Sequence, residues 1–247
     1  MSFELPADAS ARLSLAKGYP FEAPNDCFVW RDTGSGSRLS PIAGADFSGR
    51  TPVLAHGSNR APTQLARKFA GRPGLERDIP VTAGWLEDTD VVYSAHVTSY
   101  GAIASTLRHV PGCRVRVAVT WLTDAQLLRM HETEGANYRY GHLTRRFAAD
   151  SGPQPAFDRL PTYVSDHGSL TRDAAPIGLA AVQAENRPHQ AIDQTAALML
   201  VRDRHHPDEH LDNCILANIA DGARRSTLIA CLRASALAAD LTDFEAL

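Results

Sequence analysis

Residues 53–69 read VLAHGSNRAPTQLARKF, and this stretch indicates how the centre of the chain is built. A short apolar run leads into a Gly-Ser-Asn turn, and a helical pattern follows, with Pro62 in its first turn and Leu65 and Phe69 four residues apart. Proline is tolerated there because the first N–H groups of a helix have no partner within it. Those N–H groups, beside a glycine, can hold an anion. By itself, the pattern more often marks an ordinary strand–turn–helix corner.

The composition is that of a globular protein with a sizeable core. The chain has 247 residues, of which 44% are hydrophobic and 21% charged, which suits one large domain or two small ones. The net charge is −3 and the basic residues are dispersed, so we expect no nucleic-acid partner. The four cysteines form no CxxC pair, which favours free thiols in a reducing compartment over a disulfide framework or a zinc ribbon.

The ends and the apolar runs predict a soluble, cytoplasmic protein. Residues 1–25 lack the basic start and apolar core of a signal peptide. No apolar run is long enough to suggest a membrane-spanning helix, so we expect no membrane partner.

The first half of the chain is predicted to consist mainly of strands. Residues 1–52 are punctuated by prolines and predict an irregular lead-in, with a flexible turn at 34–37 and one short strand at 27–30. Runs rich in β-branched and aromatic residues then predict strands at 79–86, 90–97, 101–107 and 114–121, with a turn at Pro111-Gly112.

A helix is predicted from Thr123 to Gly135. Gln126 stands three residues after Thr123, as in a capping box. Glu132 and Glu134 therefore lie at the end of the helix, where the helix dipole disfavours a carboxylate. A carboxylate in that place either has another reason to be there or simply faces water.

The last third of the chain is predicted to be mostly helical. Residues 150–160 mark a loop, and residues 162–165 predict a last strand. Helices are expected at 191–201, from Pro207 to Asp221, and at 226–241. We therefore predict an α+β fold, divided into a lead-in packed on the core (1–52), a core (53–160) and a helical C-terminal extension of the same domain (161–247).

Five motifs of the middle of the chain, in this order, resemble those of the γ-glutamylcyclotransferase-like superfamily. They are the loop His56-Gly57-Ser58-Asn59, the strand Tyr100-Gly101-Ala102-Ile103-Ala104, Pro111-Gly112 with the strand that runs to Trp121, the segment from Leu122 to Gly135, and Tyr138. The resemblance covers about residues 53–145. It implies a mixed β-barrel with flanking helices, to which this chain would add an extra helical C-terminal region.

The resemblance also implies a reaction. In that family the α-amine of the substrate attacks its own γ-carbonyl, which releases an amine and leaves 5-oxoproline. Much of the rate comes from proximity, because the nucleophile is tethered to its electrophile. A base must still take the ammonium proton and return one to the leaving nitrogen. Glu134 matches the family's general acid/base, and we expect partial burial and its helix-end position to raise its pKa.

The resemblance likewise implies the binding residues. The amides of residues 57–59 would hold the substrate carboxylate or the oxyanion. The expected substrate-binding residues are His56, Gly57, Ser58, Asn59, Tyr100, Gly101 and Tyr138. The mechanism requires no metal and no organic cofactor. The expected partner is a small-molecule substrate, and the sequence leaves a homo-oligomer open.

One departure from the family opens two other interpretations. His56 stands where the family usually has tyrosine, and histidine titrates near neutral pH. The protein could instead be a hydrolase or lyase of a related amide or carbamoyl compound, with His56 taking part in the chemistry. A third interpretation is a non-catalytic binding module, which a pocket closed by the lead-in, or a solvent-facing Glu134, would favour.

Other patterns are weaker. His206 and His210 are four residues apart, but Pro207 favours a solvated helix start over a metal site. Residues 166–169 read Asp-His-Gly-Ser, but adjacent residues rarely form a catalytic triad, which favours a loop. Cys113 stands beside Arg114, which could lower a thiol pKa, although a packed cysteine is the simpler interpretation. His96 either lines the same pocket as Tyr100 or is a core histidine.

Overall fold

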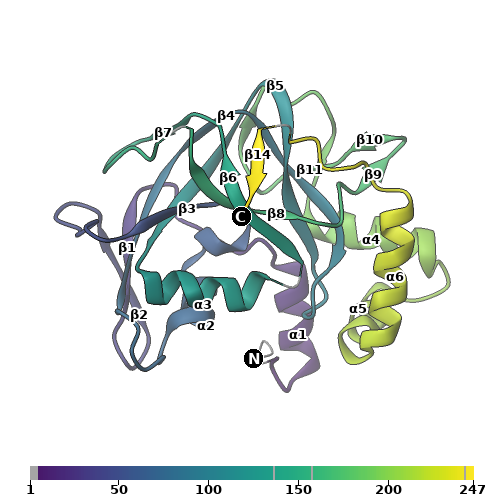
Figure 1. Ribbon diagram of the computed structural model, residues 1–247. Coiled ribbons are helices and arrows are strands. Elements are labelled where there is room, and N and C mark those ends of the chain that lie inside the picture. Colours follow the sequence, from purple (N-terminus) through teal and green to yellow (C-terminus); the bar gives the residue numbers. More distant parts are fainter. Residues whose placement is uncertain (1–4, 136, 157, 242) are drawn as a thin grey trace.

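The centre of the molecule is one long β-hairpin. The computed structural model describes residues 5–135, 137–156, 158–241 and 243–247. Strands β4 (Asp78–Val97) and β5 (Ile103–Leu122) each have 20 residues and pair antiparallel along most of their length (Figure 1). They replace the four separate strands that the sequence predicts. Each strand is long because its residues pair with those of the other strand, from Val81 opposite Thr120 to Val97 opposite Ile103.

The predicted turn at Pro111-Gly112 is wrong, because β5 runs through it. The pairing shifts from Glu87 opposite Arg114 to Thr89 opposite His109, so Asp88 alone lies opposite four residues. The Gly112 N–H donates to Asp88 Oδ1 at 2.8 Å, and Gly112 has a φ of +76°, which suits glycine. The Pro-Gly pair therefore forms a bulge in a continuing strand.

The remaining strands extend this hairpin into a mixed sheet. The sheet follows the order β13-β11-β4-β5-β3-β8-β6-β14, in which β3 pairs parallel with β8 and β11 pairs parallel with β13. The bounds of these strands are Thr51–Ala55 for β3, Tyr138–Leu143 for β6, Leu160–Ser165 for β8, Gly178–Leu179 for β11, Ala191–Ile192 for β13 and Phe244–Ala246 for β14. With the helices described below, the predicted α+β class is confirmed.

The sheet is not the closed barrel that the resemblance implies. Among the described residues, the path of paired strands ends at β13 on one side and at β14 on the other. The C-terminal strand β14 pairs with the edge of β6 that lies away from β8, so β6 does not pair back to the start of the path. Short strands attach beside the path: β1 (Phe28–Asp32) and β7 (Phe147–Ala149) pair with β4, and β12 (Ala184–Glu185) pairs with β5. Strands β9 (Thr171–Arg172) and β10 (Ala175–Pro176) form a separate pair.

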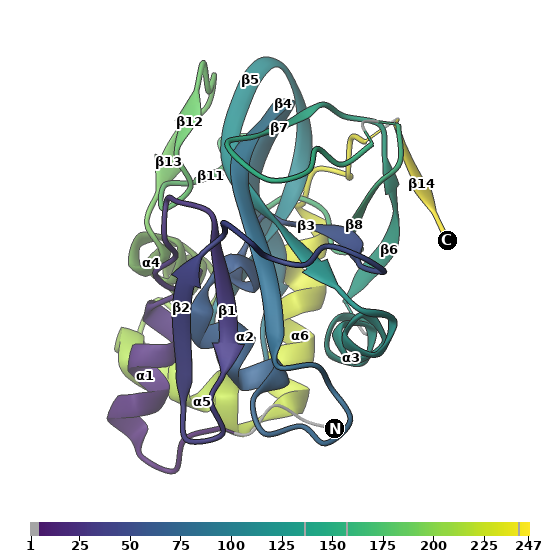
Figure 2. The same ribbon diagram turned by 90° about the vertical axis from the view of Figure 1, so that its left-hand side faces the viewer.

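The lead-in is more regular than predicted. Helix α1 (Ala9–Lys17) begins after Asp8, whose side chain accepts a hydrogen bond from the Ala11 N–H. The expected short strand is present as β1, and the Gly-Ser turn joins it to β2 (Ser37–Pro41). β1 also pairs with the first part of β4, which anchors the lead-in to the sheet (Figure 2).

Two helices follow the predicted pattern closely. Helix α2 (Pro62–Phe69) starts at Pro62, directly after a short 3-10 helix, η1 (Ser58–Arg60). Helix α3 (Asp124–Glu134) is capped by Thr123, and the Thr123–Gln126 capping box is present. Their packing faces meet over one small hydrophobic cluster, in which Leu65, Phe69 and Met130 are buried. This shared cluster fixes the end of α2 close to the end of α3.

The C-terminal third is only partly helical, and its helices are displaced from the predicted ranges. Residues 162–165 do not form the last strand, because short strands and loops continue to residue 192. Helix α4 spans Gln194–His205, α5 spans Leu211–Ala220 and α6 spans Gly222–Ala234. His210, and not Pro207, precedes α5, and the Asp221 side chain accepts the N–H groups of Ala223 and Arg224 to start α6.

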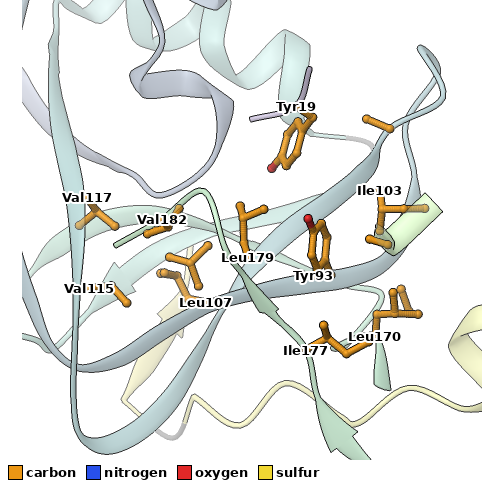
Figure 3. Close-up of a cluster of buried hydrophobic side chains, with 14 of the residues drawn as sticks. Tyr19, Tyr93, Ile103, Leu107, Val115, Val117, Leu170, Ile177, Leu179 and Val182 are labelled. Carbon is orange, nitrogen blue, oxygen red and sulfur yellow. The ribbon is translucent and has the colours of Figure 1, made fainter. Parts of the chain in front are cut away.

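The larger hydrophobic cluster lies against the long hairpin. Side chains from β4, β5 and the 170–182 segment converge there, among them Tyr93, Leu107 and Leu179 (Figure 3). Leu15 of α1 and Leu198 of α4 belong to the same cluster. The predicted division at residues 52 and 160 stays a prediction. Within the described part of the chain, no helix is both long and apolar enough to cross a lipid bilayer.

Candidate active site

A pocket of about 1130 Å³ opens where the loop after β3 meets the C-terminal end of α3. Its lining includes Glu134, His56, Gly57, Ser58, Asn59, Tyr100 and Tyr138, so seven of the eight predicted site residues share one cavity. Gly101 is not in the lining. A Cβ atom on Gly101 would lie 2.9 Å from Ile219, and its φ is +85°, so close packing against α5 accounts for this glycine.

The Glu134 carboxylate is bonded on one oxygen. Oε1 accepts a hydrogen bond from Asn59 Nδ2 at 3.1 Å and forms an ion pair with Lys68 Nζ. No hydrogen bond from another described residue reaches Oε2. The side chains of Glu134 and Lys68 are 13% and 6% exposed, so this ion pair is largely withdrawn from water. The pair leaves one carboxylate oxygen available to a ligand in the pocket.

The pKa of Glu134 is lowered, and the predicted increase is wrong. Burial raises the pKa, but the charge and hydrogen bond of Lys68, the Asn59 hydrogen bond and the nearby His56 together lower it below its ordinary value. The sequence-based expectation considered burial and the helix dipole alone. Glu134 is therefore a carboxylate at neutral pH, which can accept a proton.

His56 is held by hydrogen bonds on both ring nitrogens. Nε2 lies 3.0 Å from the Tyr163 carbonyl oxygen, which can only accept, so Nε2 carries a proton. Burial lowers the pKa of His56, so the ring is neutral and Nδ1 is an acceptor. The Ser105 hydroxyl, 3.3 Å away, then donates to Nδ1. His56 therefore has no free nitrogen for chemistry in this arrangement.

The lead-in completes this chain of hydrogen bonds. The Tyr19 hydroxyl lies 2.6 Å from Ser105 Oγ and accepts the Ser105 N–H at 3.0 Å. Because the Ser105 hydroxyl proton is used on His56, the Tyr19 hydroxyl donates to Ser105 Oγ. Burial raises the pKa of Tyr19 to about 12, so the phenol keeps its proton.

Gly57 is required by this arrangement. A Cβ atom there would lie 2.5 Å from the Tyr19 hydroxyl oxygen and 2.7 Å from Ser105 Oγ, which is closer than such atoms tolerate. No hydrogen bond from the N–H groups of Gly57 and Ser58 to another described residue is seen. These two groups are therefore the free donors that an anion would need.

The two predicted tyrosines belong to the lining of the same pocket. The Tyr138 hydroxyl donates to the Ser105 carbonyl at 3.1 Å. The Tyr100 hydroxyl is hydrogen-bonded by Thr98 and Ser58. Burial raises the pKa of both phenols above the ordinary value, so both are neutral groups in the pocket wall.

Cationic side chains line much of the pocket. Arg67, Lys68, Arg72 and Arg129 all contribute to the lining, against Glu132 and Glu134. Glu132, the neighbouring acid on α3, lies at the rim with its side chain 51% exposed and pairs with Arg129 at 2.7 Å. The pocket therefore carries an excess of positive charge.

The weaker patterns fall elsewhere. Asp166 pairs with Arg139 at 2.6 Å and His167 Nε2 contacts Asn137 at 3.3 Å, so residues 166–169 show no triad arrangement. His210 caps α5. Burial raises the pKa of Cys113 to about 11, as expected for a packed thiol.

His96 lines the pocket together with Tyr100. Its ring stacks on that of His167, with ring centroids 4.6 Å apart and an interplanar angle of 10°. Burial lowers the pKa of His96 to about 3, so its ring is neutral.

Sequence reasoning missed Tyr19, Lys68 and Ser105. Lys68 reads as a basic residue in the last turn of α2, and its partner Glu134 is 66 positions away. Tyr19 lies in a lead-in outside the family resemblance. Ser105 is one of several small residues on a buried strand. The sequence offered a signal for Lys68 alone: a lysine three residues after Leu65 and one before Phe69, on the side of the helix that packs inward.

Comparison with known proteins gives similarity in structure alone. No family model and no curated protein matches this sequence. The chain is similar in structure to a γ-glutamyl cyclotransferase. The alignment has 18% identity and a TM-score of 0.37, and it covers 47% of this chain and 66% of that one.

Two other solved structures align in a similar way. A protein from Arabidopsis thaliana aligns over 50% of this chain and 74% of its own, with 14% identity and a TM-score of 0.37. An uncharacterized human protein aligns over 69% of this chain and 88% of its own, with 14% identity and a TM-score of 0.38. At these identities and scores the similarity assigns neither a reaction nor a residue.

Proposed function

We propose that this protein is a γ-glutamylcyclotransferase-like enzyme that cyclises a γ-glutamyl-type or related small amide. The reaction would yield 5-oxoproline and a released amine. The observation that carries the proposal is the half-bonded Glu134: Oε1 is held by Asn59 and Lys68, while Oε2 is left for the substrate. Asn59 belongs to the same loop that offers the free N–H groups of Gly57 and Ser58.

The groups in the pocket suit the steps of intramolecular aminolysis. Glu134, ionised at neutral pH, takes a proton from the α-ammonium and frees the nucleophile. The N–H groups of Gly57 and Ser58 hold the substrate carboxylate or the oxygen that gains charge as the ring closes. The substrate supplies its own nucleophile, so no group of the protein has to form a covalent bond with it.

The size of the pocket supports an amide with a substantial leaving group. Its volume of about 1130 Å³ is slightly above the roughly 300–1,000 Å³ of typical small-molecule sites and exceeds what a glutamyl group needs. The remaining space would hold the amine part of the substrate.

The four cysteines are free thiols. Free thiols support a reducing compartment, and we place the enzyme in the cytoplasm without a metal or organic cofactor.

Two observations weigh against the other interpretations. Both nitrogens of His56 are in hydrogen bonds, which disfavours a hydrolase or lyase that uses His56 as its base. Glu134 lines an accessible pocket, whose rim includes the exposed Arg72 and Ser99. A closed pocket or a solvent-facing Glu134 would have favoured the binding module.

The test is a panel of γ-glutamyl amides and dipeptides, assayed by mass for 5-oxoproline and the released amine. The wild type is expected to form both products. Glu134→Gln is expected to lose about 10³-fold in kcat/KM, because the amide cannot take up the proton. Glu132→Gln, on the same helix but at the exposed rim, is the matched control and should change activity less than about threefold.

Three results would contradict the proposal. Release of plain glutamate would indicate hydrolysis. Full activity of Glu134→Gln would remove the carboxylate from the mechanism. Turnover of no member of the panel would exclude γ-glutamyl amides as the substrate class.

A further inference from the structure

Lys68 has an unusual environment for a lysine. It lies in the last turn of α2, and its side chain is 6% exposed while lining the pocket. Its ammonium forms an ion pair with Glu134 Oε1 and lies 3.2 Å from Met130 Sδ. No hydrogen bond to a further described residue is seen. Burial of an ammonium is costly, and here one carboxylate compensates its charge.

We infer that Lys68 is the general acid of the reaction and gives a proton to the nitrogen that leaves the substrate. This inference rests on the proposed function and adds a second catalytic residue to it. Glu134 alone would have to take a proton on one side of the substrate and release it on the other. Two adjacent groups, one a carboxylate and one an ammonium, can divide these tasks.

The ion pair gives a reason for the order of the steps. When Glu134 Oε2 takes the proton from the substrate ammonium, the carboxyl becomes neutral. Lys68 is then a buried ammonium without a counter-charge, which is unfavourable. Transfer of one of its protons to the leaving nitrogen relieves that cost at the stage at which the carbon–nitrogen bond has to break.

The protons balance over one turnover. The freed amine attacks the γ-carbonyl carbon and forms the new carbon–nitrogen bond. Lys68 protonates the leaving nitrogen as the old bond breaks, and Glu134 returns its proton to Lys68. The regenerated carboxylate then takes the second proton from the ring nitrogen and passes it to the released amine. The products are 5-oxoproline and an ammonium ion, and both residues end as they began.

Other groups in the pocket are poorer acids. The guanidinium groups of Arg67 and Arg129 do not release protons in proteins. Burial raises the pKa of Tyr138 and raises that of Tyr19 to about 12, so their phenols hold their protons. His96, with its pKa lowered to about 3, is neutral and has no acidic proton to give.

The test uses two substrates that differ in their need for an acid. A γ-glutamyl alkylamide releases a strongly basic amine, whose nitrogen has to be protonated before it leaves. A γ-glutamyl p-nitroanilide releases a weakly basic aniline, whose nitrogen leaves without being protonated first. Lys68→Met is expected to lower kcat about 100-fold or more on the alkylamide and less than about fivefold on the anilide.

Two further variants keep the result interpretable. Lys68→Arg preserves the positive charge beside Glu134 but cannot give up a proton, so it should show the same selective loss with the fold retained. Lys17→Met removes a lysine that pairs with Asp212 on the α1 surface, and it should leave both rates unchanged. Thermal unfolding of each variant shows whether it is folded.

The outcomes separate the two proposals. A selective loss on the alkylamide supports Lys68 as the general acid. Equal losses on both substrates would overturn that role, because Lys68 would then act only through Glu134. A wild type that forms no 5-oxoproline from either substrate would overturn the proposed function and the role of Lys68 with it.

Discussion

Two buried carboxylates beside cations, Asp90 and Glu134, differ in how completely they are bonded. Asp90 has contacts on both oxygens: Val91 N–H and Arg187 donate to Oδ1, and Arg187 and His189 lie 2.7 Å from Oδ2. Its side chain is fully buried. Glu134 is bonded on Oε1 alone and lines the pocket.

The difference separates a structural ion pair from a site that can bind a ligand. Arg187 and His189 hold the 182–192 segment against β4 through Asp90, and both carboxylate oxygens are in contact with these partners. At Glu134 one oxygen remains, and the cation beside it is an ammonium that can exchange protons. In the proposed mechanism, similar residue types therefore serve stability in one place and chemistry in the other.

The largest expected effect is on stability, at Asp90. Asp90→Asn leaves the Arg187 guanidinium without its counter-charge, and breaking a buried pair in this way costs about 4 kcal/mol. In a chain of this size, that loss lowers the melting temperature by roughly 10 °C. Activity per folded molecule should be unchanged, since Asp90 does not line the pocket. Thermal unfolding and the 5-oxoproline assay measure the two effects separately.

Asp150→Asn is the matched control. Asp150 forms an ion pair with Arg116, and the Asp150 side chain is 43% exposed. The loss of this pair should therefore cost less than about 1 kcal/mol. An Asp90→Asn variant that is stable but inactive would break the distinction between the two carboxylates.

A smaller effect is expected from Ser105→Ala. The substitution removes the hydroxyl between Tyr19 and His56, so His56 Nδ1 loses its donor and the Tyr19 hydroxyl proton loses its acceptor, at a cost of about 2 kcal/mol. Because His56 neither takes up nor releases a proton in the proposed mechanism, kcat should fall less than about tenfold. Ser37→Ala, on the exposed strand β2, is the control. A loss greater than about 100-fold in a stably folded variant would favour the interpretation in which His56 takes part in the chemistry.

The smallest expected effect is on the pH dependence. The pKa of Glu134 is held below its ordinary value in the folded protein, so the base stays ionised and the acid limb of kcat/KM lies below the pH at which a free glutamate titrates. Lys68→Met removes two of the influences that lower this pKa, so its acid limb should move to higher pH. The γ-glutamyl p-nitroanilide assay measures both profiles, with circular dichroism at each pH as a check on folding. A wild-type limb above the pH at which a free glutamate titrates would indicate the raised pKa that burial alone predicts.

Local features of the sequence predict the parts of the site that depend on local structure. The capping box at Thr123 and Pro62 at the start of α2 place the two helices correctly. The loop 56–59 and Glu134 reach one pocket because each terminates a well-marked element.

Features that depend on distant partners could not be predicted in this way. Pro111-Gly112 looks like a turn, and only the pairing of β5 with β4 shows that the strand continues. The sequence indicates that Lys68 lies on the inner side of α2, but its partner Glu134 is not evident until α2 packs against α3. The error in the pKa of Glu134 has the same origin, since the charge that lowers it comes from another helix.

The central claim is that the free oxygen of Glu134 receives the ammonium of the substrate. A crystal structure of the wild-type protein with a γ-glutamyl amide analogue, in which a methylene group replaces the γ-carbonyl, tests it directly, because this analogue cannot cyclise. We predict the α-ammonium nitrogen at about 2.7–3.2 Å from Glu134 Oε2, with Lys68 still on Oε1. An ammonium bound away from Glu134, or one that displaces Lys68 from Oε1, would contradict the account.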